Sequence, residues 1–472
     1  MLRHHHTTRA RIGRSLAVPL AALTIVGAAA CGSSSTPSSS TTAAPGTAQA
    51  PGSSTTAKTS GSTPGSTPGS TPGSTPGTSP ATPASTCVKD PDKVIATQPT
   101  AASTTAELPA DLTSKLDAAA QSSFKEAATP GAIVGVRTPQ GTFTKAYGDA
   151  DPDKKIPMEV GMHTRIGSVT KTFTGTLILQ LVQQGKLSLD DTIDKYVSGV
   201  PNGDRITIRQ LANMTSGVKS YTADEKFTDI YFAKPETVFK PDELIAVGLA
   251  GSPIFEPGEK FNYSNTNTLL LGKVVEKVTG QPIVDVFNKA ILEPLKLTNT
   301  SWPGESTAIP EPYAQGFTLQ GDTAKPDAPA NATNWNPAWG WTAGEMISNM
   351  GDLLTYGRAL GTGQGMLDPA TQKQRLTSFP GAAGYGIAMG CVDGWVGHTG
   401  ELPGYNTSVF YDTTTDTTVI VQVNSDIASG KCEQSPTLTD DPGDIPCSAP
   451  ATRMFVALST ALGHTFTPPA AK

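Results

Sequence analysis

The chain has few charged residues and no excess of positive charge. Asp, Glu, Lys and Arg make up 16% of its 472 residues, and the formal net charge is −6. Recognition of nucleic acid requires a basic face on the protein. The composition therefore argues against a nucleic-acid partner. The sequence also lacks a convincing cluster of His, Cys, Asp and Glu at metal-ligand spacing, so we expect no metal site.

Hydrophobic residues are also scarce, at 37%, and the deficit is concentrated in the first hundred residues. Residues 32–86 are almost entirely Ser, Thr, Pro, Gly and Ala, and residues 61–76 are four copies of Gly-Ser-Thr-Pro. Such a segment has too little apolar surface to offset the entropy lost on ordering. We therefore expect a disordered linker over residues 31–104.

The N-terminus has no apolar run long enough to span a membrane comfortably. The apolar stretch of residues 15–30 follows a basic segment with four arginines, which is typical of an export signal, here residues 1–30. Ala28-Ala29-Ala30 before Cys31 fits an ordinary A-x-A cleavage site, but it also resembles a bacterial lipobox. Because a tether follows at once, we favour lipidation of Cys31 and a place on the outer face of a bacterial membrane. Without lipidation the protein would be secreted.

Cysteine is sparse as well, with five residues in the chain. If Cys31 carries the lipid, Cys87, Cys391, Cys432 and Cys447 remain, and four cysteines allow three pairings. An oxidising compartment makes disulfides the expected state of these residues.

From about residue 105 the composition becomes that of a globular domain, which we expect over residues 105–466. Apolar patterns predict strands over residues 132–136 and 142–147 near its beginning, and over 385–389, 395–398, 406–411 and 417–423 near its end. Residues 160–365 are mainly helical, and a closing helix covers residues 449–462. The pattern predicts an α+β fold, in which one antiparallel sheet is built from both ends of the domain around a helical insertion.

Ser168-Val-Thr-Lys171 places a hydroxyl and an amine one turn apart on the same face of a predicted helix. A serine hydroxyl becomes a nucleophile when a neighbouring base accepts its proton. The same spacing occurs at Ser122–Lys125 and Ser216–Lys219, and any one match alone usually marks a solvated helix face. Only the context of Ser168, at the start of an apolar helix, distinguishes it from the other two.

Two further motifs follow Ser168 in the chain. Tyr263-Ser-Asn265 alone would usually be an ordinary loop tyrosine before a helix, and the His398 of His398-Thr399-Gly400 a structural strand histidine. In this order, however, the three motifs resemble those of the class C β-lactamase and D-alanyl-D-alanine carboxypeptidase family, which also contains esterases. The resemblance covers about residues 105–465 and implies a β-lactamase/DD-peptidase-like fold.

The resemblance implies a role for each motif residue in acyl transfer to water. Ser168 would be the nucleophile that forms an acyl-enzyme, Lys171 would assist its deprotonation, and Tyr263 would shuttle a proton to the leaving group. Whether Lys171 or Tyr263 takes the first proton is left open. Asn265 would orient Lys171 and the substrate amide.

The third motif would complete the cleft. His398 would line it and tune Tyr263, and the backbone N–H groups of Ser168 and Glu401 would form the oxyanion hole. Thr399 and Gly400 would contact the substrate. This chemistry needs no metal or organic cofactor.

Glu401 departs from the family pattern. Thr399 and Glu401 share one face of a strand, and a hydroxyl residue usually stands at the second position, where it helps to bind the terminal carboxylate of the substrate. An ionised Glu401 would repel that carboxylate. This favours an ester or an uncharged amide over peptidoglycan stem peptides, although a D-alanyl-D-alanine carboxypeptidase-like activity stays open. The other alternative is a non-catalytic lipoprotein that keeps the fold for binding or scaffolding.

The resemblance also suggests how the cysteines pair. If the closing sheet runs as in the family, Cys391 lies at the end of the sheet where the segment before residue 106 should also lie. Cys432 and Cys447 flank an insertion at the opposite end. We therefore expect Cys87–Cys391 and Cys432–Cys447.

Overall fold

An eight-stranded antiparallel sheet forms the centre of the protein. The computed structural model describes residues 86–325, 327–432 and 441–468. The strands lie side by side in the order β3-β2-β1-β12-β11-β10-β9-β8. Strands from the two ends of the domain meet where β1 pairs with β12, with Val134 opposite Val421. The expected α+β sheet from both chain ends is therefore confirmed. The strands are β1 Gly131–Thr138, β2 Gly141–Asp151, β3 Ile156–Pro157, β8 Ala383–Tyr385, β9 Gly390–Val392, β10 Trp395–Leu402, β11 Tyr405–Asp412 and β12 Thr417–Val423.

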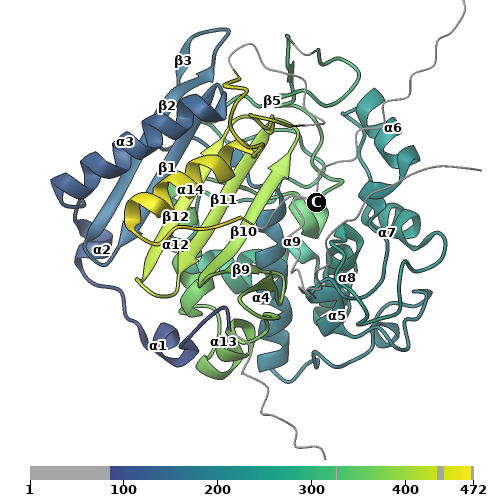
Figure 1. Ribbon diagram of the computed structural model, residues 1–472. Helices are drawn as coiled ribbons and strands as arrows, with labels where there is room; N and C mark the ends of the chain where they lie inside the picture. The colour runs from purple at the N-terminus through teal and green to yellow at the C-terminus, as the bar shows by residue number, and fades with distance from the viewer. Residues whose placement is uncertain (1–85, 326, 433–440, 469–472) are drawn as a thin grey trace, which may run out of the picture. The chain divides into compact units, whose positions relative to one another are not determined.

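Two helices cover one face of this sheet, α3 (Ala110–Ala127) and α14 (Pro450–Leu462) (Figure 1). Side chains alternate between the two faces of a strand. Val134 and Val421 accordingly point into the core below α3 and α14, together with Phe455 and Leu458 of α14. The helices come from opposite ends of the domain, so this core joins the two ends as the sheet does.

The opposite face of the sheet packs against the helical insertion. Ile133 and Ile420, next to the valines in sequence, belong to this second and larger core. Helix α12 (Met350–Thr362) lies on β1, β11 and β12. The other helices of the insertion are α4 Thr170–Gln183, α5 Ile208–Ala212, α6 Glu225–Ala233, α7 Pro241–Leu249, α8 Asn265–Thr279, α9 Ile283–Phe287, α10 Glu293–Leu295 and α11 Trp341–Gly344. Its strands are only two residues long: β4 Thr164–Arg165, β5 Phe317–Thr318, β6 Ala330–Asn331 and β7 Ile347–Ser348.

The ordered fold begins earlier than the predicted boundary at residue 105. Helices α1 (Pro91–Ala96) and α2 (Ala102–Thr105) precede it, and α1 contacts α12 and α13 (Pro369–Leu376). Cys87, only 4% exposed, is bonded to Cys391 of β9. A linker prediction based on composition missed these contacts because they are made with residues far along the chain. The predicted signal peptide, Cys31 and the Gly-Ser-Thr-Pro repeats lie outside the described residues.

A hairpin replaces the strand predicted over residues 385–389. Strand β8 ends at Tyr385, and strand β9 begins at Gly390. Between them, the backbone N–H of Gly386 donates to the carbonyl of Met389. Ala388 has a φ of 51°, in the left-handed region, which closes the turn. Most of the apolar side chains that suggested a strand belong to this turn, and they are buried.

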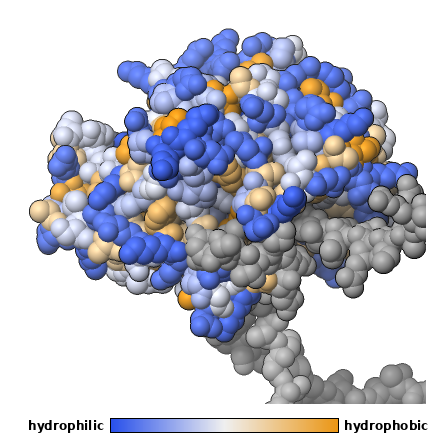
Figure 2. Space-filling model, turned by 90° about the horizontal axis from the view of Figure 1, so that it is seen from above, coloured by the Kyte–Doolittle hydropathy of each residue, from blue (hydrophilic) through white to orange (hydrophobic). Residues whose placement is uncertain are grey.

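The surface of the described domain is mainly hydrophilic. In Figure 2, hydrophobic residues are scattered in small groups over the face seen from above. The large hydrophobic residues that are exposed in the described ranges are Ile156, Ile230 and Ile254. Within those ranges no helix has both the length and the apolar character needed to cross a bilayer.

Candidate active site

Ser168 lies in a tight turn at the start of α4. Residues Gly167–Val169 form a single 3₁₀ turn, and α4 follows directly from Thr170. Gly167 has a φ of 51°, which glycine adopts without steric cost. The turn leaves Ser168 partly exposed to a pocket while its neighbours Gly167 and Val169 are buried. Ser168 thus lines a pocket at the N-terminal end of a helix, where the helix dipole stabilises negative charge.

Lys171 is placed to take the proton of Ser168. Its side chain is completely buried, and its Nζ lies 2.8 Å from Ser168 Oγ and 2.7 Å from the carbonyl oxygen of Ala343 in α11. Burial lowers the pKa of Lys171 well below its usual value, because the charged form is poorly solvated. A neutral amine can donate to Ala343 and accept the proton of Ser168 at the same time.

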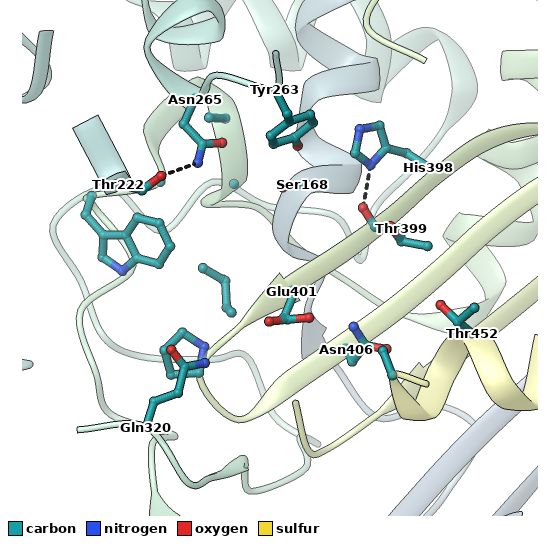
Figure 3. Close-up of a pocket in the computed structure, with 17 residues that line it drawn as sticks. Ser168, Thr222, Tyr263, Asn265, Gln320, His398, Thr399, Glu401, Asn406 and Thr452 are labelled. Atoms are coloured by element: carbon teal, nitrogen blue, oxygen red, sulfur yellow. Dashed lines mark hydrogen bonds between the residues drawn. The ribbon is translucent and has the colours of Figure 1, made fainter. Parts of the chain in front are cut away.

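Tyr263 completes the group around the nucleophile. The Lys171 Nζ lies 4.9 Å from the centre of the Tyr263 ring, and both Ser168 and Tyr263 line the pocket (Figure 3). Burial raises the pKa of Tyr263 above its usual value, an effect that a hydrogen bond with Ser168 partly offsets. Lys171 favours the neutral amine and contacts Ser168 Oγ, whereas Tyr263 favours the protonated phenol, so the site favours Lys171 as the first proton acceptor.

His398 contacts Tyr385, a residue for which the sequence predicts no role in the site. Its Nε2 lies 3.0 Å from the hydroxyl of Tyr385, and its Nδ1 contacts the carbonyl oxygen of Thr399. The Nδ1–H donates to that carbonyl, so Nε2 is the atom that accepts from Tyr385. Burial, and to a lesser extent Lys171, lowers the pKa of His398 to about 3, so the ring is neutral. The ring centres of Tyr263 and His398 are 6.1 Å apart, and the expected tuning of Tyr263 by His398 stays a prediction.

Asn265 does not hold Lys171 as expected. Its side-chain amide donates to Thr222 Oγ1 at 3.1 Å, and its backbone N–H donates to Ser220 Oγ at 3.1 Å. Asn265 still lines the pocket at the start of α8, where it can meet a substrate amide. The carbonyl of Ala343 positions Lys171 instead. No sequence signal reveals this, because any residue supplies a backbone carbonyl.

Gly400 allows β10 to approach the turn at Ser168. A Cβ atom at Gly400 would lie 1.9 Å from the carbonyl oxygen of Ile166 and 3.1 Å from the amide nitrogen of Ser168. A Cβ at Gly167 would lie 2.5 Å from the amide nitrogen of Glu401. Both glycines are therefore required for this contact. It brings Ser168 and Glu401, which both line the pocket, close to one another, and an oxyanion hole built from their N–H groups would require such a contact.

Glu401 points into the pocket, between the catalytic group and Gln320 (Figure 3). Burial raises its pKa to about 8, and repulsion from Asp426 adds to the shift. At pH 7 the protonated form therefore predominates. The sequence predicted that Glu401 repels a substrate carboxylate, but that prediction assumed an ionised side chain. A mainly protonated Glu401 repels a carboxylate less strongly than an ionised one would.

Comparison with known proteins agrees with this geometry. Residues 113–434 match the family model described as Beta-lactamase. Protein flp of Staphylococcus aureus is 33% identical over 223 residues, which is 45% of this chain and 43% of that relative, so the match spans less than half of its length. The D-stereospecific amidohydrolase of a Streptomyces species is 33% identical, with a TM-score of 0.60 over 66% of this chain and 94% of that chain.

A penicillin-binding protein homologue from Pyrococcus abyssi is 25% identical, with a TM-score of 0.60 over 75% of this chain and 78% of that chain. The family match covers more than half of the chain and includes Ser168, Lys171, Tyr263 and His398. The chain belongs to the beta-lactamase family of serine hydrolases.

Proposed function

We propose that this protein hydrolyses small amides and esters of D-amino acids through an acyl-enzyme on Ser168. The observation that carries the proposal is the contact between Ser168 Oγ and the buried amine of Lys171. Ser168 attacks the substrate carbonyl as Lys171 takes its proton, and the N–H groups of Ser168 and Glu401 stabilise the oxyanion. Tyr263 delivers a proton to the leaving amine or alcohol as its bond to the carbonyl carbon breaks. Water then hydrolyses the Ser168 ester.

The D-configuration and the amide bond are suggested by one relative. The Streptomyces protein, 33% identical and matched over nearly its whole chain, is described as a D-stereospecific amidohydrolase. The reaction class itself rests on the site and not on this likeness. The acyl-enzyme route serves amides and esters alike, because both have a carbonyl and a protonatable leaving group.

A second candidate activity is that of a D-alanyl-D-alanine carboxypeptidase on peptidoglycan peptides. The His398-Thr399-Gly400 motif favours it. The pocket disfavours it, because the described residues that line it include Glu401 but no Lys or Arg to bind a terminal carboxylate. Export and a lipid on Cys31 would place either activity in the cell envelope.

Three substrates test the proposal with the purified full chain: D-alanine p-nitroanilide, p-nitrophenyl acetate and a pentapeptide analogue ending in D-alanyl-D-alanine. We expect hydrolysis of the first two, little release of D-alanine from the third, and loss of hydrolysis in Ser168→Ala. Ser122→Ala, at an exposed serine of α3 with the same spacing to a lysine, is the matched control. Efficient release of D-alanine would favour the carboxypeptidase. Absence of hydrolysis together with absence of any Ser168 adduct would favour a non-catalytic binding protein.

A further inference from the structure

A buried tyrosine that the proposed mechanism does not use lies next to Tyr263 and His398. Tyr385 is the last residue of β8 and is only 3% exposed. It is not among the described residues that line the pocket. Its hydroxyl lies 3.0 Å from His398 Nε2, and its ring stands at 90° to the rings of both Tyr263 and His398, with centres 6.0 and 5.5 Å away. Tyr385 therefore contacts two residues of the site without facing a substrate.

Tyr385 is the donor in its hydrogen bond with His398. Burial raises the pKa of Tyr385 well above its usual value, and Tyr263 adds to the shift, so the hydroxyl keeps its proton. The neutral ring of His398 directs its Nδ1–H to the carbonyl oxygen of Thr399, which leaves Nε2 as the one acceptor atom of the ring. The bond from Tyr385 therefore uses the single acceptor that His398 offers.

The backbone on both sides of Tyr263 is held by Met214. The carbonyl oxygen of Met214 accepts from the N–H of Asn262 at 2.9 Å, and its Sδ accepts from the N–H of Ser264 at 3.5 Å. Met214 and Tyr385 also pack with Tyr263 in one apolar cluster. Because its backbone is fixed in this way, what the Tyr263 hydroxyl contacts depends on the acceptors next to its side chain.

Tyr263 lies next to two groups that can accept a hydrogen bond. One is Ser168, with which it forms a hydrogen bond. The other is His398, whose ring lies beside that of Tyr263 with the centres 6.1 Å apart (Figure 3). A phenol that donates to His398 directs its proton away from the nucleophile, whereas one that stays with Ser168 keeps its proton where the scissile bond breaks.

We infer that Tyr385 is a positioning residue for the general acid Tyr263. By donating to His398 Nε2 it occupies the atom that would otherwise accept from Tyr263, and so reserves the phenol proton for the leaving group. The inference rests on the proposed function, in which the scissile bond breaks as the leaving nitrogen or oxygen takes the electron pair and the proton of Tyr263. The phenolate then recovers a proton from the ammonium that Lys171 becomes when it deprotonates Ser168.

Two substrates with the same acyl group separate this role from a structural one. The nitrogen of D-alanine p-nitroanilide must be protonated as it leaves, whereas D-alanine p-nitrophenyl ester releases a stable p-nitrophenolate. Tyr385→Phe keeps the ring and removes the hydroxyl. We expect kcat/KM for the anilide to fall by about ten- to a hundredfold, a part of the usual 10²–10⁴-fold contribution of a general acid, and kcat/KM for the ester to stay within about threefold.

The matched control is Tyr411→Phe. Tyr411 is a buried tyrosine of β11 whose hydroxyl donates to Asp416 at 2.9 Å, and it is not among the described residues that line the pocket. This variant should keep the wild-type ratio of the two kcat/KM values. Equal losses for anilide and ester in Tyr385→Phe, or no loss for either, would overturn the inference while the proposed function stands. So would the same change of ratio in Tyr411→Phe.

Coupling between the two tyrosines gives a second test. Tyr263→Phe removes the general acid itself, so adding Tyr385→Phe should cause no further loss of anilide hydrolysis. Losses that multiply in the double variant would show that Tyr385 acts independently of Tyr263, and would contradict the inference.

A crystal structure of Tyr385→Phe tests the exchange of hydrogen bonds without catalysis. We expect the hydroxyl of Tyr263 to lie within about 3 Å of His398 Nε2 in this variant. If the wild type hydrolyses neither substrate but the exchange is seen, the proposed function fails and the positioning of Tyr263 by Tyr385 stands. If Tyr263 keeps its wild-type place beside Ser168, the inference is contradicted whatever the catalytic result.

Discussion

Lys171 Nζ contacts both Ser168 Oγ, at 2.8 Å, and the carbonyl oxygen of Ala343, at 2.7 Å, although Lys171 has no solvent exposure. A charged ammonium without a carboxylate partner is costly in such a place. Burial therefore shifts the amine toward its neutral form, which is the form the chemistry needs, and the contact with Ser168 orients it toward the nucleophile.

Lys171→Arg should abolish most of the activity while preserving the hydrogen-bonding capacity of the site. A guanidinium stays protonated and cannot accept the proton of Ser168. We expect kcat/KM to fall by about 10²–10⁴-fold, the usual contribution of a general base. In the wild type, activity should decline as pH falls, because protonation of Lys171 removes the base. Lys125→Arg, at an exposed lysine of α3 with the same spacing from a serine, should leave the pH profile unchanged. An active Lys171→Arg enzyme would show that another group is the base.

Gly400→Ala should disrupt the oxyanion hole from the side of β10. The new Cβ would lie 1.9 Å from the carbonyl oxygen of Ile166, so the strand must move away from the turn at Ser168. Removal of one oxyanion donor costs about 10²–10³-fold in kcat, and we expect a loss of at least this size. Gly161→Ala is the matched control, because a Cβ there meets no other atom within 4 Å. Equal activities of the two variants would contradict the close approach, provided that circular dichroism shows both to be folded.

The raised pKa of Glu401 predicts how stability depends on pH. Its folded-state pKa of about 8 lies above the reference value of 4.5, so the folded protein binds more protons than the unfolded chain between these values. The wild type should therefore lose stability as pH rises through this window. The difference in unfolding free energy between Glu401→Gln and the wild type should therefore grow by about 1–3 kcal/mol, in favour of the variant, from pH 5 to pH 9. This is a reduced share of the roughly 1.4 kcal/mol that each unit of pKa difference contributes. Chemical denaturation at the two pH values measures this gain, and a difference that does not change with pH would contradict the assignment.

The two disulfides should contribute unequally to stability. Cys87–Cys391 closes a separation of 304 residues and ties the first helices to β9, whereas Cys432–Cys447 closes only 15. Loop-closure entropy grows with the length of the loop. Replacing Cys87 and Cys391 by serine should lower the unfolding free energy by about 2–5 kcal/mol, and the same change at Cys432 and Cys447 by about 3 kcal/mol or less. Denaturation of the two double variants checks the order, and the reverse order would contradict it.

The elements whose sequence pattern is strong were predictable. Helix α4 has the apolar period and the terminal glycine that mark a buried helix, and β1 and β12 have the runs of branched residues that mark a central strand. The order of the Ser168, Tyr263 and His398 motifs placed the site, since these residues act through their own side chains.

What the sequence did not reveal depends on contacts between distant segments. Ala343 contacts Lys171 through its carbonyl, Tyr385 contacts His398 through a hydrogen bond, and Asp426 contributes to the raised pKa of Glu401. None of these has a local pattern. For the same reason α1 and α2 were assigned to the linker, because their order comes from packing against α13 and β2 rather than from their own composition.

The mass of the enzyme during turnover shows directly whether Ser168 forms an acyl-enzyme. The full chain is mixed with a slowly hydrolysed p-nitrophenyl ester, quenched in acid, digested and mapped by mass spectrometry. We expect one acyl group per chain on Ser168, no acyl group on Ser122 or Ser216, and no adduct in Ser168→Ala. An acyl group on another residue, or hydrolysis that persists in Ser168→Ala, would contradict this expectation.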